Sequence, residues 1–347
     1  MFKHLIGNQH VQHTLKLLLT HNRLPNSLLF AGDEGIGKRQ FALAAARAVV
    51  CVKRDDEIPC GVCSACVRAG KFNIPEPTDK NKDSFKKIFL SDHVDVATVV
   101  PYKNFILVDA IRDLEREANF NPYEAPARFF IIDEADKMND AAASALLKTL
   151  EEPPPTSFIF LVTSRPDSLL PTIRSRCQTL RFAPIPDDEI ERYLIDSCAF
   201  SHDEARLASR LSRGSIGRAV SIDVAKFRLV RGRMLDVLRH AIETGDRAAL
   251  LRASEEMNEA KNKELFEENL DVLESLIHDV WTLRSGSEPE RIVNADLLDE
   301  LTALSENAGC ADLHMWLSEI ETMRQNFIVN INRKIAADAL FISMAGA

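Results

Sequence analysis

A short loop at residues 32–38 contains residue types suited to binding phosphate. It reads GDEGIGK, follows the apolar run Leu28 to Ala31 and precedes a helix-prone stretch. Lys38 is expected to reach the β- and γ-phosphates of a nucleotide. The loop glycines let backbone amides converge on an anion at the start of a helix; they are Gly32, Gly35 and Gly37. This order of strand, loop and helix predicts a P-loop; a glycine turn without a ligand is the alternative.

The residue after the lysine departs from the chemistry of nucleotide hydrolysis. A hydrolysing P-loop has Ser or Thr there, because the hydroxyl ligates Mg²⁺, whereas this chain has Arg39. A guanidinium has no acceptor and cannot ligate a cation. Gln40 offers an amide oxygen on a different side of the helix and is a poor substitute. We therefore expect a phosphate-binding loop without a good metal ligand, and the sequence leaves open whether ATP or ADP occupies it.

An acidic pair follows a second apolar run. Residues 128–132 read RFFII, which suits a central parallel strand covered on both faces, and Asp133 and Glu134 come directly after it. Ligands bind at the carboxyl ends of strands in open α/β sheets. Asp133 would hold Mg²⁺ through water, and Glu134 would orient the attacking water. The pair predicts the acidic half of a nucleotide site.

Four cysteines lie within 16 residues, with spacing typical of metal ligands; they are Cys51, Cys60, Cys63 and Cys66. Four thiolates around Zn²⁺ form a closed tetrahedral site, which is structural and not catalytic. A ferredoxin-type cluster would need another Cys and a Pro soon after the third close cysteine, and neither is present. Free or redox-active thiols are the remaining alternative. We predict a zinc knuckle at residues 51–66.

The chain has 347 residues, 46% of them hydrophobic, and a formal net charge of −9. This length suffices for two or three domains. No run approaches the roughly 18 apolar residues of a membrane span, and the N-terminus lacks the pattern of a secretion signal, so a cytoplasmic protein is expected. The negative charge argues against a broad basic surface for nucleic acid, although a few contacts stay compatible with it.

Alternating strand and helix patterns must position these residues. Five strands are predicted near residues 28–31, 94–100, 128–132, 157–164 and 178–182. Asn139 is a predicted N-cap for the helix that follows it. The polar segment 71–90 is expected to be a surface excursion. After Pro184 helical patterns dominate, with apolar stripes that begin at Phe266 and Leu313 and predict a bundle core.

Longer stretches around these motifs carry a family resemblance. They are RLPNSLLFAGDEGIGK, NPYEAPARFFIIDEADKMNDAAASALLKTLEEPP, LVTSRPDSLLPTIRSRC and GSIGRA. Together with the cysteine knuckle, they resemble AAA+ clamp-loader subunits of bacterial DNA polymerase III over essentially the whole chain. The resemblance implies an α/β P-loop domain at 1–184 with a parallel five-stranded sheet and the inserted zinc knuckle. A small helical lid at 185–222 and an all-α collar domain at 223–347 would complete the architecture.

The resemblance gives Arg176, in the SRC motif, the role of an arginine finger. Such a guanidinium is supplied in trans and neutralises charge on the phosphoryl group in a neighbouring subunit's ATP site. A surface ion pair is the alternative. In GSIGRA, the position where motor subunits have a sensor arginine is Gly217, and Arg218 lies about 100° further round a helix. The chain thus lacks the Mg²⁺-ligating residue after the P-loop lysine and the sensor arginine, while it keeps the arginine finger. This combination fits a stationary, non-hydrolysing subunit.

The resemblance also implies the partners. They are the gamma/tau motor subunits and the delta subunit, and through the assembly the sliding clamp and primed DNA; no membrane partner is expected. The isolated chain should show no catalysis of its own and should hold structural Zn²⁺. Two other interpretations stay open: an ATP-hydrolysing AAA+ motor, which Arg39 opposes, and a zinc-containing scaffold with a vestigial P-loop.

Overall fold

The computed structural model describes residues 5–53, 59–258, 265–288, 292–327 and 332–346. The chain forms two compact units, Met1–Ser221 and Ile222–Ala347. Each unit has hydrophobic core clusters made only of its own residues.

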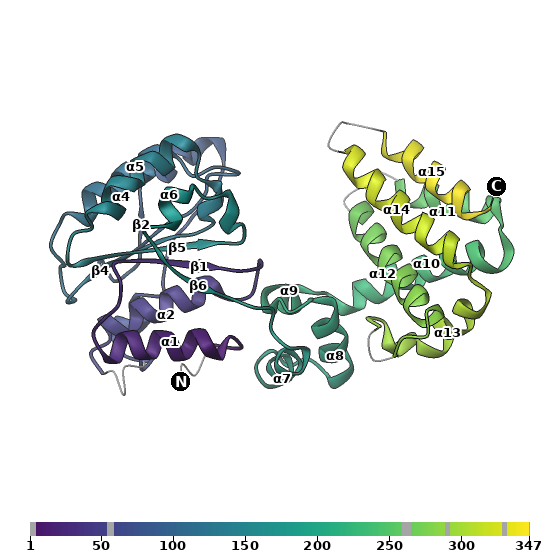
Figure 1. Ribbon diagram of the computed structural model, residues 1–347, viewed down its shortest axis with the longest axis horizontal. Helices are drawn as coiled ribbons and strands as arrows, with labels where there is room; N and C mark the ends of the chain where they lie inside the picture. Colours follow the sequence, from purple (N-terminus) through teal and green to yellow (C-terminus); the bar gives the residue numbers. More distant parts are fainter. Residues whose placement is uncertain (1–4, 54–58, 259–264, 289–291, 328–331, 347) are drawn as a thin grey trace. The chain divides into compact units, whose positions relative to one another are not determined.

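A six-stranded sheet forms the centre of the first unit, in the order β2-β3-β4-β5-β1-β6 (Figure 1). The strands are β1 (Ser27–Ala31), β2 (Phe89–Leu90), β3 (Val96–Val99), β4 (Arg128–Ile132), β5 (Ser157–Thr163) and β6 (Gln178–Arg181). All neighbours pair in parallel except β2 and β3, which are antiparallel. The carboxyl ends of β1, β4 and β5 consequently lie at one edge of the sheet.

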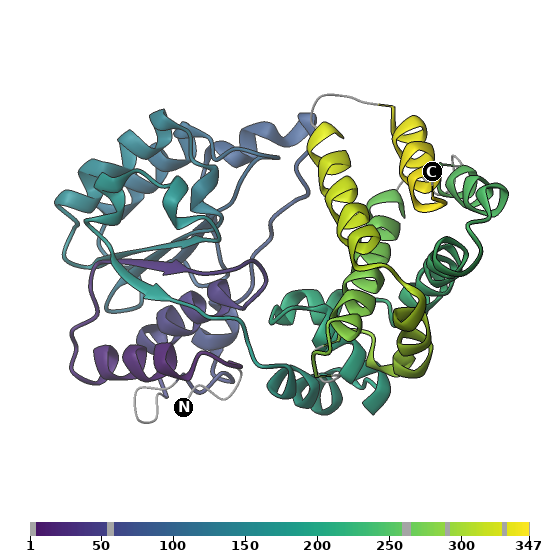
Figure 2. The same ribbon diagram turned by 45° about the vertical axis from the view of Figure 1, so that its right-hand side comes forward.

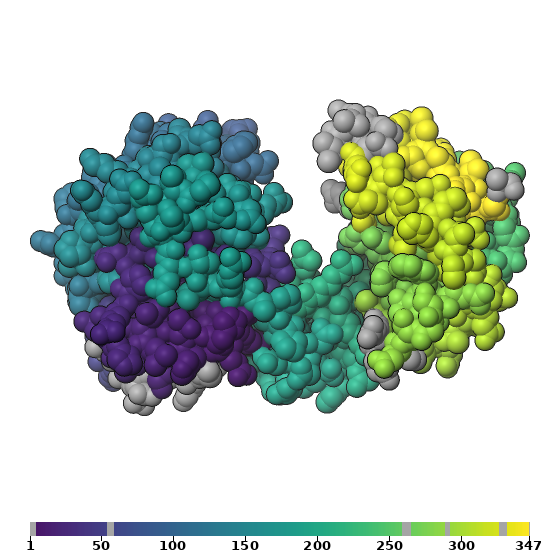
Figure 3. All heavy atoms as spheres, viewed as in Figure 1, coloured from purple at the N-terminus to yellow at the C-terminus, as the bar shows by residue number. Residues whose placement is uncertain are grey.

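Helices cover both faces of this sheet (Figures 1 and 2). Because side chains alternate along a strand, Leu28 and Phe30 join one core cluster and Leu29 and Ala31 join the other. The first cluster packs against α1 (Gln9–Thr20) and α2 (Lys38–Val50); the second packs against α4 (Val108–Ala118) and α5 (Asp140–Glu151). Figure 3 shows these layers as purple atoms on one side of the first unit and blue to teal atoms on the other.

The five predicted parallel strands are present, and the prediction missed the sixth. The short strand β2 pairs with β3 at the edge, where only two residue pairs are formed. The segment expected to be a polar excursion also contains a 3-10 helix, η1 (Asp79–Lys86), whose Phe85 is buried against Phe89 and Tyr102. A single buried phenylalanine among charged residues gives no periodic pattern, so the sequence did not reveal this anchor.

Local signals account for several helix ends. The Asn139 side chain accepts a hydrogen bond from the Ala142 amide at 2.9 Å, which confirms the predicted N-cap of α5. Ser201 and Glu204 form a capping box at the start of α8. The remaining helices of the first unit are α3 (Ser64–Arg68), η2 (Ala135–Lys137), η3 (Pro166–Ser168), α6 (Pro171–Arg174), α7 (Asp187–Cys198), α8 (His202–Leu211) and α9 (Ile216–Ser221).

The described residues of the second unit form helices joined by loops, with no strand among them. Its helices are α10 (Val224–Arg239), η4 (His240–Thr244), α11 (Arg247–Asn258), α12 (Phe266–Arg284), η7 (Ala295–Leu297), α13 (Leu298–Asn307), α14 (Cys310–Phe327) and α15 (Arg333–Met344). The two predicted stripes are buried in its core from Phe266 to Val280 and from Leu313 to Met323. Phe327, the last residue of the second predicted stripe, lies outside the described side chains. Figure 2 shows α14 lying along α12, the contact that these two stripes make.

Candidate nucleotide pocket and metal centre

The P-loop connects β1 to α2 and needs its glycines for backbone geometry. Gly35 and Gly37 have φ angles of +75° and +92°, which L side chains rarely adopt. Helix α9 packs directly on this loop, since the Gly217 amide donates to the Gly35 carbonyl at 2.8 Å. A Cβ on Gly217 would lie 3.2 Å from the Gly35 Cα, so glycine permits this close approach.

Lys38 starts α2 and is folded back onto its own loop. Its Nζ donates to the Gly32 carbonyl at 2.7 Å and to the Asp33 carbonyl at 2.5 Å. Only 6% of the residue is exposed. Burial lowers the pKa of Lys38 below its usual 10.5, and nearby carboxylates, Asp133 first, oppose that shift. The ammonium has three donors, so one remains for a ligand.

Arg39 and Asp133 form an ion pair across the pocket. The Arg39 Nη1 lies 3.2 Å from the Asp133 Oδ2, and the guanidinium lies over the Phe72 ring at 5.9 Å. Burial raises the pKa of Asp133 above its usual value, and the Arg39 charge opposes this rise. The other cation near this carboxylate, Lys38, has a smaller effect.

Two further acids at the ends of the strands already have partners. The Glu134 carboxylate lies 2.5 Å from the Lys137 Nζ, and its backbone has a positive φ of 47°. The Thr163 hydroxyl at the end of β5 donates to Asp136 at 2.6 Å. Asp136 was not among the predicted site residues, although its place shortly after β4 is a usable signal.

These side chains line a cavity of about 960 Å³. Of the predicted nucleotide-binding residues, the lining includes Gly35, Gly37, Lys38, Arg39, Asp133 and Glu134. The loop glycine that precedes them, Gly32, takes part through its carbonyl bond to Lys38. Helices α7 and α9 contribute aromatic and apolar surface that the sequence did not reveal, from Tyr193, Ile216 and Val220. The cavity is large enough for a nucleotide.

Arg176 is not among the residues that line this cavity. It follows α6, and its Nη2 lies 2.5 Å from Glu151 at the end of α5. Its Nη1 also donates to the Thr172 carbonyl at 2.9 Å. About a third of the side chain is exposed, 34%. The guanidinium is therefore held in place at the surface and separate from the pocket of its own chain.

The four cysteine sulfurs all lie within 4.8 Å of one another. Cys51 follows α2, Cys63 caps α3 and Cys66 lies within α3. The Cys51 and Cys63 Sγ atoms are 3.8 Å apart. This matches the edge of a tetrahedron with Zn–S bonds of about 2.3 Å, which is about 3.8 Å. The cluster can bind a metal ion, and its four sulfurs with this separation fit Zn²⁺.

Backbone amides support the sulfurs. The Cys63 amide donates to the Cys60 Sγ at 3.3 Å, across a turn in which Gly61 has a φ of +74°. The Cys66 amide donates to the Cys63 Sγ at 3.5 Å. Although burial opposes it, this amide and the neighbouring thiols lower the pKa of Cys63 to about 6, which favours the thiolate that ligates metals.

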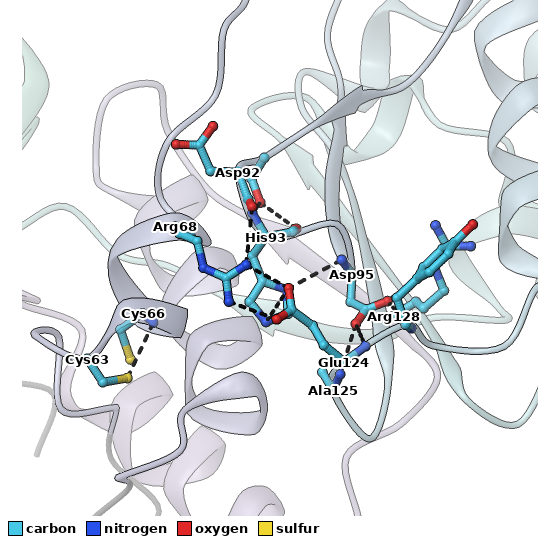
Figure 4. Close-up of polar contacts among 11 residues, drawn as sticks. Cys63, Cys66, Arg68, Asp92, His93, Asp95, Glu124, Ala125 and Arg128 are labelled. Atoms are coloured by element: carbon cyan, nitrogen blue, oxygen red, sulfur yellow. Dashed lines mark hydrogen bonds and ion pairs between the residues drawn. The ribbon is translucent and has the colours of Figure 1, made fainter.

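Ion pairs tie the knuckle to the sheet (Figure 4). Both Arg68 terminal nitrogens donate to the Glu124 carboxylate at 2.8 Å. The Glu124 amide in turn donates to the fully buried Asp95 at 2.9 Å, which also accepts from the amides of Tyr123 and Ala125. Arg128 at the start of β4 lies 3.8 Å from Asp95. A continuous polar network thus runs from α3 to β3 and β4.

Comparison with known proteins identifies the family. Residues 7–186 match the family described as "DNA polymerase III, delta subunit", and residues 231–343 match its C-terminal family. The chain is 30% identical over 291 residues to the Bacillus subtilis DNA polymerase III subunit delta', covering 83% of this chain and 82% of that protein. The chain belongs to the delta-prime family of DNA polymerase III subunits.

Other relatives of this delta-prime family member agree. The Escherichia coli subunit delta' is 28% identical over 323 residues, which cover 91% of this chain and 88% of that protein. The Bacillus subtilis subunit tau is 32% identical over 189 residues, which cover 54% of this chain and 30% of tau. The predicted resemblance to subunits of bacterial DNA polymerase III is confirmed. In the parts of the chain that the structure describes, no helix has the length and apolar character needed to cross a membrane.

Proposed function

We propose that this chain is a non-hydrolysing clamp-loader subunit that completes the ATP site of a neighbouring motor subunit with Arg176. The Arg39–Asp133 ion pair carries the proposal, because it places a cation between the two positions that hold Mg²⁺ in a hydrolysing P-loop. Arg176 supports it from a separate, partly exposed position. A guanidinium there is accessible to the γ-phosphate of another subunit.

The partners in this proposal are gamma/tau motor subunits and a delta subunit. Relatives named subunit delta' and subunit tau both resemble this chain, which supports a shared ring architecture. Through such a ring the chain would help to place a sliding clamp on primed DNA. A cytoplasmic location follows from that role. The isolated chain would have no catalysis of its own, and any ATP or ADP that it binds would not be hydrolysed.

Zinc belongs to the proposal as a structural ion. Cys51, Cys60, Cys63 and Cys66 would supply four thiolates and leave no open position for substrate. The ion would order a knuckle that contributes few apolar side chains of its own. Elemental analysis of the purified chain should give one zinc per molecule, and fully titratable thiols without metal would contradict the site.

The decisive experiment replaces the finger in a reconstituted loader. Arg176→Ala should slow hydrolysis at the neighbouring site by at least about 10³-fold, judged from fingers in GTPases. Single-turnover ATP hydrolysis is the measurement, because steady-state rates combine several sites. Arg174→Ala is the matched control, since Arg174 lies two residues away and pairs with Asp167 at 2.5 Å. Unchanged single-turnover hydrolysis with Arg176→Ala would refute the assigned role.

The same preparation tests the motor alternative. The isolated chain should hydrolyse no Mg-ATP above the background of Lys38→Ala. Hydrolysis that this substitution abolishes would identify a motor and overturn the proposal.

A further inference from the structure

A cation built into the chain occupies the place that a metal ion takes in hydrolysing P-loops. There, Mg²⁺ lies between the residue after the P-loop lysine and the acid that ends the neighbouring strand. In this chain those positions are Arg39 and Asp133, and their side chains meet at 3.2 Å. The Phe72 ring, 5.9 Å from the guanidinium, supports it from a segment outside both motifs.

We propose that the pocket binds a nucleoside di- or triphosphate without Mg²⁺, with Arg39 supplying the positive charge that the metal supplies elsewhere. This goes beyond the proposed function, because neither Arg176 nor any partner subunit takes part. A metal-free nucleotide carries more negative charge than its magnesium complex. Its phosphates therefore match a site with two fixed cations, Lys38 and Arg39.

Donors for the phosphates are already in position. Lys38 uses two of its three donors on loop carbonyls and keeps one for a ligand. The Arg39 side chain is 38% exposed, and one of its nitrogens reaches Asp133. The guanidinium has five N–H donors, so most of them lie outside this ion pair and can bind phosphate in a fork. Gly37 ends the loop at the start of α2, where the helix adds partial positive charge.

The same residues disfavour a metal ion. Arg39 has no acceptor atom for Mg²⁺, and its charge repels a divalent cation next to it. Glu134 is paired with Lys137 at 2.5 Å and Asp136 accepts from Thr163 at 2.6 Å, so neighbouring carboxylates are engaged. Magnesium in solution would instead compete by binding the free nucleotide.

Equilibrium binding to the isolated full-length chain tests this inference. A fluorescent ADP analogue and unlabelled ADP would be titrated in excess magnesium and in EDTA, the latter brief enough to keep the zinc content unchanged. We expect binding in EDTA to be at least as tight as in magnesium. Arg39→Thr supplies a hydroxyl and removes the built-in cation, so its ADP binding should become at least about tenfold tighter with magnesium than without it.

Two outcomes would overturn the inference. One is wild-type binding that requires magnesium. The other is no ADP binding in either buffer by a chain whose circular dichroism and zinc content show that it is folded. Lys38→Ala locates the site, because it should weaken binding in both buffers; undiminished binding would place the nucleotide elsewhere and also overturn the inference. None of these results depends on the Arg176 experiment, so the two can fail separately.

Discussion

At the scale of single residues, the chemistry of the pocket depends on the residue after the P-loop lysine. A hydroxyl there would be a metal ligand, whereas the Arg39 guanidinium is an ion-pair partner for Asp133 at 3.2 Å. Burial disfavours the charged form of Asp133, and Arg39 is the largest influence that stabilises it. Arg39 therefore opposes, without cancelling, the rise in the pKa of Asp133 that burial causes.

Removing that cation should change the titration of Asp133. We expect Arg39→Ala to raise the pKa of Asp133 further above its wild-type value, measured by carboxyl NMR titration. Between the unfolded pKa of 3.8 and the higher folded pKa, the folded chain binds more protons than the unfolded chain. The contribution of Asp133 to the free energy of unfolding is therefore greatest at low pH and falls as pH rises from the unfolded pKa to the folded pKa. This pH range is wider in Arg39→Ala. Arg165→Ala is the control, because Arg165 lines the same cavity; an unchanged Asp133 titration in Arg39→Ala would contradict the prediction.

At the scale of elements, the cysteine knuckle contacts, through α3, a loop that is distant in sequence. Arg68 forms an ion pair with Glu124, and the amides of residues 123–125 donate to Asp95 beside β3 (Figure 4). The buried His93 lies 3.7 Å from Glu124, and burial lowers the pKa of His93, so it is neutral at pH 7. Polar contacts thus join α3, the loop at residues 123–125 and the starts of β3 and β4.

Metal removal should destabilise the knuckle and the loop that it contacts, but not the centre of the sheet. Stripping zinc with a chelator should increase amide hydrogen exchange in residues 60–69 and, through Arg68, in residues 121–126. Strands β4 and β5 should keep their protection, because their core is covered by helices on both faces. Hydrogen exchange with mass spectrometry measures this, with the helices of the second unit as internal reference. Faster exchange confined to residues 60–69 would show that Arg68 does not couple the knuckle to residues 121–126.

Asp95 should be the most sensitive position in the network. Asp95→Ala removes the acceptor for three backbone amides. It also removes the carboxylate that lies 3.8 Å from the buried Arg128. We expect a loss of at least about 3 kcal/mol in the free energy of unfolding, measured with urea. Asp92→Ala is the matched control at an exposed carboxylate of the same loop. A loss below about 1 kcal/mol for Asp95→Ala would show that water or other groups replace it.

At the scale of the whole molecule, the hydrophobic core clusters of the two units are separate. The first unit holds the sheet, the pocket, Arg176 and the cysteine cluster, and the second holds a helical core of its own. Helix α12 is central to that core, with Leu270, Leu273 and Ile277 fully buried. Buried Asp279 accepts from the Val293 and Asn294 amides and so fixes the chain that leaves α12. The second unit therefore has the contacts of an independent domain.

This division predicts two unfolding transitions. A fragment of residues 222–347 should fold alone and unfold cooperatively, as followed by circular dichroism. In the full chain, zinc removal should lower only the transition of the first unit, because all four cysteine ligands belong to it. A fragment without a cooperative transition, or a shift of both transitions on chelation, would contradict the prediction.

By itself, the sequence determined the parts of this protein that depend on local order along the chain. These parts are the strand patterns, the glycine spacing around Lys38, the helix cap at Asn139 and the cysteine spacing. Each involves residues only a few positions apart, so its geometry follows from the local backbone. Only the tertiary structure decided the contacts between distant segments: Arg39 with Asp133, Arg68 with Glu124, and Gly217 against Gly35. No local periodicity encodes which two of many charged side chains will meet. These contacts form when the sheet brings the ends of its strands together and α9 packs on the P-loop.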